Sequence, residues 1–509
     1  MACTVQSGTI VGIEGLPVQV EVDLVRRLPK VTVVGLPADA VRESTERVRS
    51  AILASGLEFP KLRVTINLAP ADLRKTGTGF DLPIALGILA ESGQIPVERM
   101  HDFLFCGELS LDGALRPVRG VLPMALMARE QGIKAVVLPA NCAGQAAVVP
   151  GIQALGATTL MEVVEMLRGE VELTEAQPRL SNHKALKYDF ADVRGQHIAR
   201  RALEIAAAGG HHVLLVGPPG AGKTMLAARM PGILPEMSFE EVLDVTRIHS
   251  VAGLLPSDAS LVENRPFRAP HHSISAPAML GGANLRPGEL SLAHRGVLFL
   301  DEVLEFRRDV LEQLRGPIEA REVTISRVGG MVRFPAACAI VAAANPCPCG
   351  YHGHPTRPCR CPDAEIRRYQ NRLSGPLLDR FDLFVRLEPV SAEDLFSVRG
   401  GESTETLRAR VEAAKRLQMG RASDTGATCN AELPAHTVRR VANTSSTAQR
   451  LLRDSVKLLS LSGRAHDRVL RVARTIADLD GSAAVDAAHI AEALAFRRQD
   501  HESGDGSLR

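Results

Sequence analysis

The sequence predicts a multidomain α/β protein organised around a nucleotide-binding core with a parallel sheet. A short apolar segment, 213–216, leads directly into G-x-x-x-x-G-K-T, and helix-forming residues follow at 225–230. A second apolar segment, 297–300, ends in the carboxylates Asp301 and Glu302. The chain has 509 residues, a length that allows roughly three or four domains. Hydrophobic residues make up 45% of it, which is enough to build the cores of those domains.

The glycine-rich motif predicts a phosphate-binding loop, because a strand, a glycine loop and a helix follow one another in the required order. Backbone N–H groups of such a loop close around phosphates at a helix N-terminus. Lys223 is expected to reach the β- and γ-phosphates, and the Thr224 hydroxyl to hold Mg²⁺. A chance glycine-rich turn is the alternative, but the strand-like segment before the motif and the helix-like segment after it disfavour that alternative. The residues assigned to binding ATP, or a close relative, are Gly217, Pro218, Pro219, Gly220, Ala221, Gly222, Lys223 and Thr224.

The two carboxylates after segment 297–300 are expected to lie at the edge of the parallel sheet, near this loop. Asp301 would hold Mg²⁺, and Glu302 would accept a proton from the attacking water. An ordinary strand end, where acids are common, is the alternative. A third apolar segment, 339–344, ends at Asn345.

Charge and composition restrict the partners. Sixty Lys and Arg oppose 58 Asp and Glu, a net charge of +2, so any nucleic-acid site has to be local. The N-terminus has no pattern of a secretory signal, and no apolar run approaches the roughly 18 residues of a membrane span. Nine cysteines in so long a chain indicate a reducing compartment. We expect a cytoplasmic protein without a membrane partner.

Four of the cysteines crowd into residues 347–361 as two C-x-C pairs, with glycines and prolines between them. Four thiolates at this density can surround one tetrahedral Zn²⁺ ion. A set of reduced surface thiols is the alternative, but exposed free thiols are generally avoided. We therefore favour a structural zinc site, separate from hydrolysis, on Cys347, Cys349, Cys359 and Cys361.

The N-terminal third has its own pattern of expected strands and helices. Segments 18–22 and 61–68 alternate apolar and polar residues, as half-buried strands do. Segments 38–57, 82–90 and 122–130 are helix-like. The pattern predicts a separate α+β domain.

Two stretches of this domain, 67–83 and 107–113, resemble the N-terminal domain of the ComM/YifB family of magnesium-chelatase-like ATPases. That domain is similar in fold to the Lon protease domain, whose peptidases use a serine and a lysine. Overlaying the motifs puts Gly79 at the serine and Leu122 at the lysine. Neither residue can supply the nucleophile or the base, so the resemblance implies a non-peptidase domain.

The resemblance covers nearly the whole chain and implies its domain organisation. An AAA+ ATPase core and a helical lid follow the Lon-like domain, which is joined to the core by a polar linker. The implied bounds are 1–168 for the Lon-like domain, 169–188 for the linker, 189–390 for the core, 391–500 for the lid and 501–509 for a disordered tail.

The resemblance also implies roles for residues outside the phosphate loop. Segment 188–196 is similar to the AAA+ segment that packs beside adenine. Asn345 matches the polar sensor that orients the lytic water, and Arg464 matches the sensor-2 arginine. Arg380 matches an arginine finger that reaches the γ-phosphate of a neighbouring subunit. The alternative for Arg380 is a salt bridge to one of the acids beside it, Asp379 or Asp382.

A β-hairpin is predicted at 323–334, where two alternating runs flank Gly329 and Gly330. Related AAA+ proteins carry a pore-facing hairpin at this point. With a turn at the two glycines, Ser326 lies opposite Arg333 and Arg327 opposite Val332. The two arginines are expected to bind DNA phosphates. The adjacent His271 and His272, in the long segment before 297–300, are interpreted as ordinary loop residues.

The resemblance implies a homo-hexameric ring that acts on single-stranded or branched DNA with ATP and Mg²⁺, with recombination proteins as candidate partners. The expected activity is branch migration during recombination of incoming DNA. A metal-chelatase ATPase subunit is the first alternative, although such subunits normally work with a domain bearing D-x-S-x-S, a motif that we do not find here. An ATP-dependent protease is the second, and the missing serine and lysine disfavour it.

Overall fold

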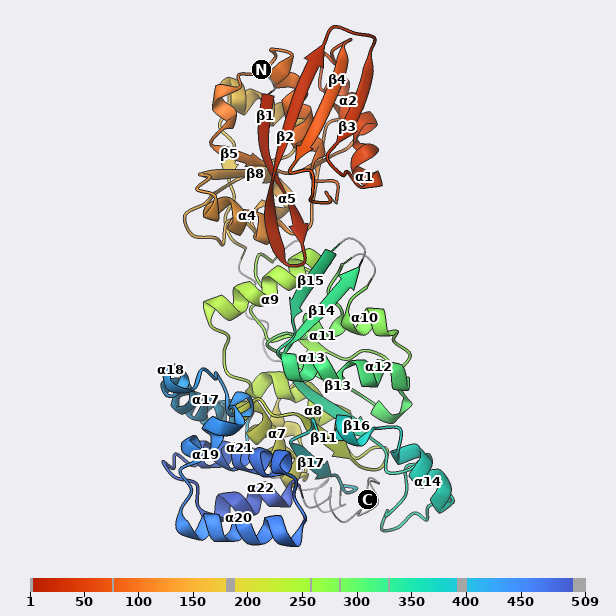
Figure 1. Cartoon of the computed structure of the whole chain (residues 1–509), viewed down its shortest axis with the longest axis vertical. Coiled ribbons are helices and arrows are strands. Elements are labelled where there is room, and N and C mark those ends of the chain that lie inside the picture. Colours follow the sequence, from red (N-terminus) through yellow and green to blue (C-terminus); the bar gives the residue numbers. More distant parts are fainter. Residues whose placement is uncertain are drawn as a thin grey trace.

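The computed structural model describes residues 3–75, 77–179, 188–256, 259–282, 285–327, 330–390 and 401–497. The molecule is elongated, with the N-terminal third at one end, the nucleotide-binding core in the middle and C-terminal helices beside the core (Figure 1). Among these residues, no helix is long and apolar enough to cross a membrane.

The N-terminal third contains two four-stranded sheets with helices packed on them. The first sheet has the order β1 (Cys3–Val11), β2 (Glu14–Val25), β4 (Arg63–Ala69) and β3 (Lys30–Val34). The second has the order β10 (Thr174–Glu175), β9 (Gln153–Ala157), β8 (Ala135–Pro139) and β5 (Phe103–Phe105). The larger helices are α2 (Ser44–Ala54), α3 (Asp81–Glu91), α4 (Val121–Glu130) and α6 (Leu160–Arg168). The predicted strands and helices are confirmed, except that helix 38–57 is divided into α1 (Asp39–Arg42) and α2.

A five-stranded, fully parallel sheet forms the core. Its order is β12 (Phe267–Arg268), β13 (Val297–Leu300), β16 (Ala339–Ala344), β11 (Val213–Val216) and β17 (Leu383–Arg386). Every residue of β13 and β16 is buried, as expected where both faces of a parallel sheet are covered. Because all strands run the same way, the residues that follow β11, β13 and β16 emerge at one edge of the sheet.

The helices around this sheet are α7 (His197–Gly209), α8 (Lys223–Ile233), α9 (Phe239–Ala252), α10 (Ala276–Leu280), α11 (Glu289–Leu292), α12 (Arg308–Gln313), α13 (Arg315–Ala320), α14 (Asp363–Gln370) and α15 (Gly375–Leu378). The helix after the phosphate loop continues through Pro231 instead of ending before it.

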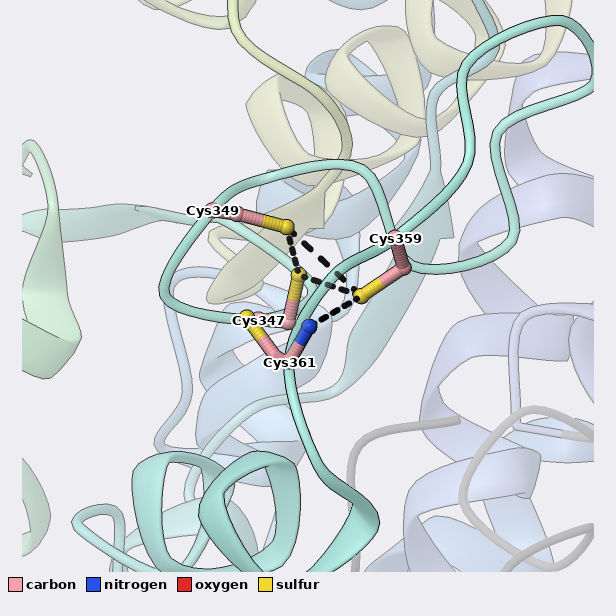
Figure 2. A group of neighbouring side chains, drawn as sticks. All are labelled: Cys347, Cys349, Cys359 and Cys361. Atoms are coloured by element: carbon pink, nitrogen blue, oxygen red, sulfur yellow. Dashed lines mark hydrogen bonds between the residues drawn. The ribbon is translucent and has the colours of Figure 1, made fainter.

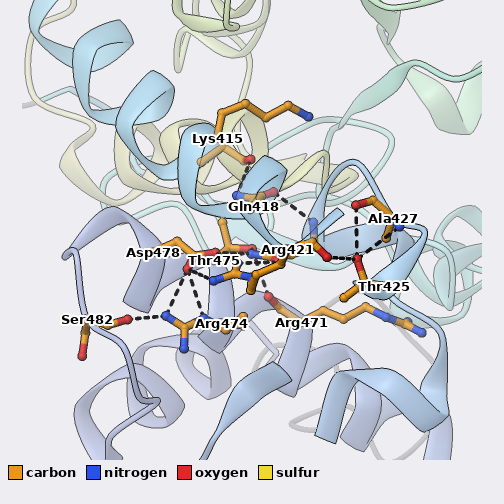
Figure 3. A network of polar contacts seen from close by, with 12 residues as sticks. Lys415, Gln418, Arg421, Thr425, Ala427, Arg471, Arg474, Thr475, Asp478 and Ser482 are labelled. Atoms are coloured by element: carbon orange, nitrogen blue, oxygen red, sulfur yellow. Dashed lines mark hydrogen bonds and ion pairs between the residues drawn. The ribbon is translucent and has the colours of Figure 1, made fainter. Parts of the chain in front are cut away.

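The C-terminal part is helical and packs on α7 and α8. Its helices are α17 (Thr404–Gly420), α18 (Ala422–Thr425), α19 (Ala435–Ala442), α20 (Ser446–Leu458), α21 (Gly463–Leu479) and α22 (Ala487–Ala495). The carboxylate of Asp478, near the end of α21, takes part in a polar network that joins this helix to the chain after α17 (Figure 3). It accepts from Arg421 Nη2 at 2.6 Å and Asn430 Nδ2 at 2.8 Å, and pairs with Arg474 Nη2 at 3.0 Å. Removing one partner of a buried charge is strongly destabilising, so this network holds the helices in one arrangement.

The predicted hairpin is present, but its predicted register is wrong. Strands β14 (Glu322–Arg327) and β15 (Gly330–Pro335) pair Arg327 with Gly330, Ser326 with Met331 and Thr324 with Arg333. The two residues between the strands are therefore 328 and 329, which lie outside the described residues. The observed register pairs the buried Ile325 with Val332. A shift of two residues keeps every side chain on the same face, so the hydrophobic pattern could not distinguish the two registers.

The N-terminal third rests directly on this hairpin and on α9, and Figure 1 shows the turn between β1 and β2 at the end of β15. A Cβ atom on Gly12 would lie only 2.5 Å from Val332 Cγ1. The buried Ile13 belongs to the same apolar cluster as Val332. Behind the turn, α4 packs on α9, where Val242 and Leu243 join the apolar core of the N-terminal part. A movement of the hairpin would therefore displace these contacts with the N-terminal part.

Candidate nucleotide-binding site

The glycine-rich loop connects the end of β11 to the start of α8. Gly220 and Gly222 have φ angles of 79° and 88°, which residues with a Cβ atom rarely adopt. Gly217 is required for a different reason, because a Cβ atom there would lie 2.9 Å from the carbonyl oxygen of Leu387. Gly217 also donates its N–H to Ala344 O of β16 at 3.1 Å. The loop therefore has the backbone shape that its glycines predict.

Lys223 points into the loop, and three oxygen atoms surround its ammonium group. Nζ donates to Gly217 O at 2.6 Å, Pro218 O at 2.9 Å and Asn345 Oδ1 at 3.0 Å. Burial lowers the pKa of Lys223, while the charges of Asp301 and Glu302 act in the opposite direction. The contact with Asn345 brings the predicted sensor residue together with the predicted phosphate-binding lysine.

The two residues predicted to hold Mg²⁺ also meet. Thr224 Oγ1, at the start of α8, donates to Asp301 Oδ2, after β13, at 2.8 Å. A hydroxyl and a carboxylate oxygen are hard ligands, and Mg²⁺ typically combines one or two carboxylates with substrate phosphates. The donor set therefore fits this ion.

Glu302 has an unusual backbone conformation, with φ at 49°. Its N–H donates to Asp301 Oδ1 at 3.0 Å, and its side chain is 54% exposed. Residues other than glycine with positive φ cost about 1–3 kcal/mol and are concentrated at functional sites. This conformation directs the Glu302 side chain out of the buried strand end.

His272, which we interpreted as a loop residue, lies beside this glutamate. Its Nδ1 atom is 3.8 Å from Glu302 Oε2. Strand β12 pairs with β13 at Phe267–Val297 and Arg268–Leu298, and His272 follows β12 as Glu302 follows β13. That signal depends on β12, a strand of two residues that the sequence pattern did not reveal. Sequence reasoning therefore missed a neighbour of the candidate base.

The segment predicted to pack beside adenine reaches the phosphate loop. Gln196 Nε2 donates to Ala221 O of the loop at 3.2 Å and to Glu388 O at 2.7 Å. Val193, three residues earlier, is buried in the core. Gln196 thus links the start of α7 to the loop.

The predicted arginine finger, Arg380, and the predicted sensor-2 residue, Arg464, lie away from this loop. Arg380 precedes β17, whereas the loop follows β11, and these two strands are parallel with Val213 paired to Leu383. Arg380 is thus at the opposite edge of the sheet, and each strand spans about 10 Å. Arg464 is exposed near the start of α21. One turn later, Arg468 Nε lies 3.7 Å from Asp382 Oδ1 at that same edge.

Arg380 does form an ion pair, but with neither of the acids that the sequence suggested. Its Nη2 atom lies 2.6 Å from Glu319 Oε1, and Nη1 donates to Pro376 O at 3.0 Å. Asp382 instead contacts His211 Nδ1 at 3.2 Å. Within the described residues, Arg380 Nε is buried without a hydrogen-bond partner.

The four clustered cysteines converge on one point (Figure 2). Their sulfur atoms all lie within 4.8 Å of one another. Cys347 Sγ is 3.3 Å from Cys349 Sγ and 3.6 Å from Cys359 Sγ. With Zn–S bonds of about 2.3 Å, tetrahedral geometry separates sulfur atoms by about 3.8 Å. The pKa shifts in the cluster differ in direction: N–H groups of Arg360 and Tyr351 contribute, against burial, to lowering the pKa of Cys349 to about 6, whereas burial raises the pKa of Cys347 and of Cys361. The donor set therefore fits a thiolate-bound zinc ion.

Comparisons with known proteins agree with this geometry along almost the whole chain. The family model "Magnesium chelatase, subunit ChlI" matches residues 189–395. "Subunit ChlI of Mg-chelatase" matches 20–142, and "Magnesium chelatase, subunit ChlI C-terminal" matches 401–497.

Several bacterial proteins are similar over their full length. An uncharacterised protein of Mycobacterium tuberculosis is 45% identical over 491 residues, covering 96% of this chain and 97% of the relative. YifB of Escherichia coli, also uncharacterised, is 43% identical over 500 residues, and competence protein ComM of Haemophilus influenzae is 41% identical over 505 residues. Each of these two alignments covers 97% of both chains.

The phosphate loop, the parallel sheet and the matched models define an AAA+ ATPase of the magnesium-chelatase type. Within that class, the chain belongs to the ComM/YifB family. Membership implies ATP and Mg²⁺ as its nucleotide and metal ion.

Proposed function

We propose that the protein is an ATP-driven motor that acts on single-stranded or branched DNA as a homo-hexameric ring. In this proposal it drives branch migration during recombination of incoming DNA, with recombination proteins as candidate partners. The main observation that supports assembly into a ring is the position of Arg380, at the edge of the sheet opposite the chain's own phosphate loop. An arginine finger at this position could act only on the nucleotide of a neighbouring subunit. Similarity to a competence protein supports DNA as the substrate.

The proposed division of labour at the ATP site follows from the contacts above. The backbone of the phosphate loop and Lys223 bind the phosphates, and Thr224 and Asp301 hold Mg²⁺. Glu302 accepts the proton of the attacking water, and Asn345 orients that water. Arg380 acts on the nucleotide of the neighbour, and Arg464 serves as the sensor-2 arginine. Positioning and charge stabilisation are most of what phosphoryl transfer requires of a protein.

We propose three domains, at 1–168, 189–390 and 391–500, with the first acting as a Lon-like scaffold. A side chain at Gly79 would meet an obstacle, since its Cβ atom would lie 2.6 Å from Cys106 Sγ. Leu122 is completely buried. Both observations support a domain without peptidase activity.

A metal-chelatase ATPase subunit is the second candidate, because the matched family models carry that name. The two candidates differ in what stimulates hydrolysis. DNA should raise the ATPase rate of a DNA motor, whereas a porphyrin and a chelatase partner should raise that of a chelatase subunit. Comparing these additions in one assay distinguishes the two functions.

The hairpin provides a more local test of DNA binding. Arg327 ends β14, and the side chain of Arg333 is 68% exposed, 3.9 Å from Glu322 at its nearest approach. Replacing Arg327 and Arg333 together by alanine should bring the ratio of ATPase rates with and without DNA close to one. Such arginines grip phosphates without reading sequence, so wild-type DNA binding should weaken steeply with salt.

A suitable control for this double variant is Arg307→Ala, which removes an exposed arginine that pairs with Asp309 elsewhere on the core. The control should keep DNA stimulation. Full stimulation in the hairpin variant would show that DNA is held elsewhere.

We also propose that the four cysteines hold one structural Zn²⁺ ion. Protein purified under reducing conditions without chelators should therefore contain about one zinc per chain, as measured by elemental mass spectrometry. Replacing Cys349 by serine should lower this content sharply, because it removes one of four thiolates. Protein that is folded and free of metal after such a purification would contradict the site.

A further inference from the structure

The loop that carries the cysteines turns back onto the phosphate loop. Gly350 has a φ angle of 83°, and its N–H donates to Cys347 O at 2.9 Å. A Cβ atom on Gly350 would lie 2.5 Å from Cδ and 2.8 Å from Cγ of Pro219. The turn formed by residues 347–350 therefore packs tightly against the phosphate loop, at a distance that only glycine permits.

The chain between this turn and β16 contacts the same site. Asn345 Oδ1 accepts from Lys223 Nζ at 3.0 Å. The next carbonyl, Pro346 O, accepts from the buried Gln370 Nε2 of α14 at 2.9 Å. The cysteine Cys347 follows directly and is itself completely buried. Within six residues, the chain thus contacts the phosphate-binding lysine, α14, the cysteine cluster and the phosphate loop.

We propose that a zinc ion on the four cysteines sets the shape of the phosphate loop, so that nucleotide affinity depends on whether the metal is bound. The inference rests on the ATP site and the zinc site proposed above. Four metal–sulfur bonds tie residues 347–349 to residues 359–361 and hold the Gly350 turn against Pro219. Without the ion the turn can relax, and both Pro219 and Asn345 lose a support. The metal thus has a role at the ATP site, beyond the separate structural role expected from the sequence.

The decisive variant is Gly350→Ala, because it disturbs the contact with Pro219 while keeping all four cysteines. We expect about one zinc per chain, an unchanged fold, and a dissociation constant for a fluorescent ATP analogue raised about tenfold or more, because the phosphate-binding groups are displaced. Adding Pro219→Ala removes the ring that the new methyl group meets and should restore part of the affinity. The readouts are zinc content, thermal unfolding and nucleotide titration.

Gly353→Ala is the matched control. Gly353 lies in the same loop and also has positive φ, at 74°. Its added Cβ atom would meet Nη2 of Arg386, the flexible end of a side chain, and not the phosphate loop. This variant has the same backbone strain and should keep wild-type nucleotide affinity.

Removal of the metal gives an independent measurement. Chelation of the wild-type protein should weaken binding of the ATP analogue, and added Zn²⁺ should restore it. Wild-type affinity in Gly350→Ala, or in a chelated and still folded wild-type protein, would overturn the coupling. If chelation unfolds the protein, wild-type affinity in Gly350→Ala still overturns the coupling. A zinc-loaded wild-type protein that fails to bind the nucleotide would instead contradict the proposed ATPase function.

Discussion

Glu302→Gln is expected to bind ATP with near wild-type affinity and to lose turnover by about 10²-fold or more. The amide has the shape of the carboxylate but cannot accept the proton of the attacking water. The groups assigned to the phosphates and Mg²⁺, including Lys223 and the Thr224–Asp301 pair, remain in place. Phosphate release measures turnover, and titration with a fluorescent ATP analogue measures binding.

The neighbouring Glu305 provides the control for this prediction. It lies in the same short segment and pairs with Arg372 at 2.9 Å. Glu305→Gln makes the same chemical change three residues away and should retain most of the activity. A Glu302→Gln enzyme that hydrolyses ATP at close to the wild-type rate would remove Glu302 from its role as the base.

Arg380→Ala is expected to inactivate the ring, with a loss of roughly 10³-fold in turnover if the side chain acts as an arginine finger. Because Arg380 lies at the edge opposite its own phosphate loop, the defect should be correctable by another subunit. Lys223→Ala subunits lose their own ATP site but keep Arg380. Mixing them in excess with Arg380→Ala subunits should restore part of the activity, measured in rings of confirmed composition.

Glu319→Gln separates this role from a structural one. It breaks the ion pair that Arg380 forms at 2.6 Å but keeps the arginine. If the ion pair alone mattered, both variants would be impaired to a similar degree. A finger predicts that Arg380→Ala loses far more activity than Glu319→Gln, because only Arg380→Ala removes the guanidinium group; in the pair, the Arg380 side chain is 10% exposed and that of Glu319 59%. No recovery in mixed rings would contradict action between subunits.

The parts of the fold that the sequence predicted best are those encoded by local patterns. The apolar segments 213–216, 297–300 and 339–344 are strands with the predicted bounds, because each is a short apolar run followed by polar residues. Their meeting at one edge follows from parallel pairing, which is why Thr224 contacts Asp301 and Lys223 contacts Asn345.

What the sequence did not predict depends on contacts between distant segments. The observed hairpin register differs from the predicted one by two residues and leaves every side chain on the same face. The alternation of apolar and polar residues therefore could not distinguish the two registers. The approach of His272 to Glu302 depends on a strand of only two residues. The partner of Arg380 is Glu319, on α13, and not an acid beside it. Nor does any local pattern encode the contact between Gly350 and Pro219.

The measurement that tests the motor most directly is branch migration of a labelled three-strand DNA substrate by the purified protein. The account predicts strand exchange that requires ATP hydrolysis, is stimulated together with ATPase activity by forked or single-stranded DNA, and is absent in Glu302→Gln. An active ATPase that ignores every DNA substrate and leaves the strands unexchanged would contradict the account, and stimulation by porphyrin in its place would favour the chelatase alternative.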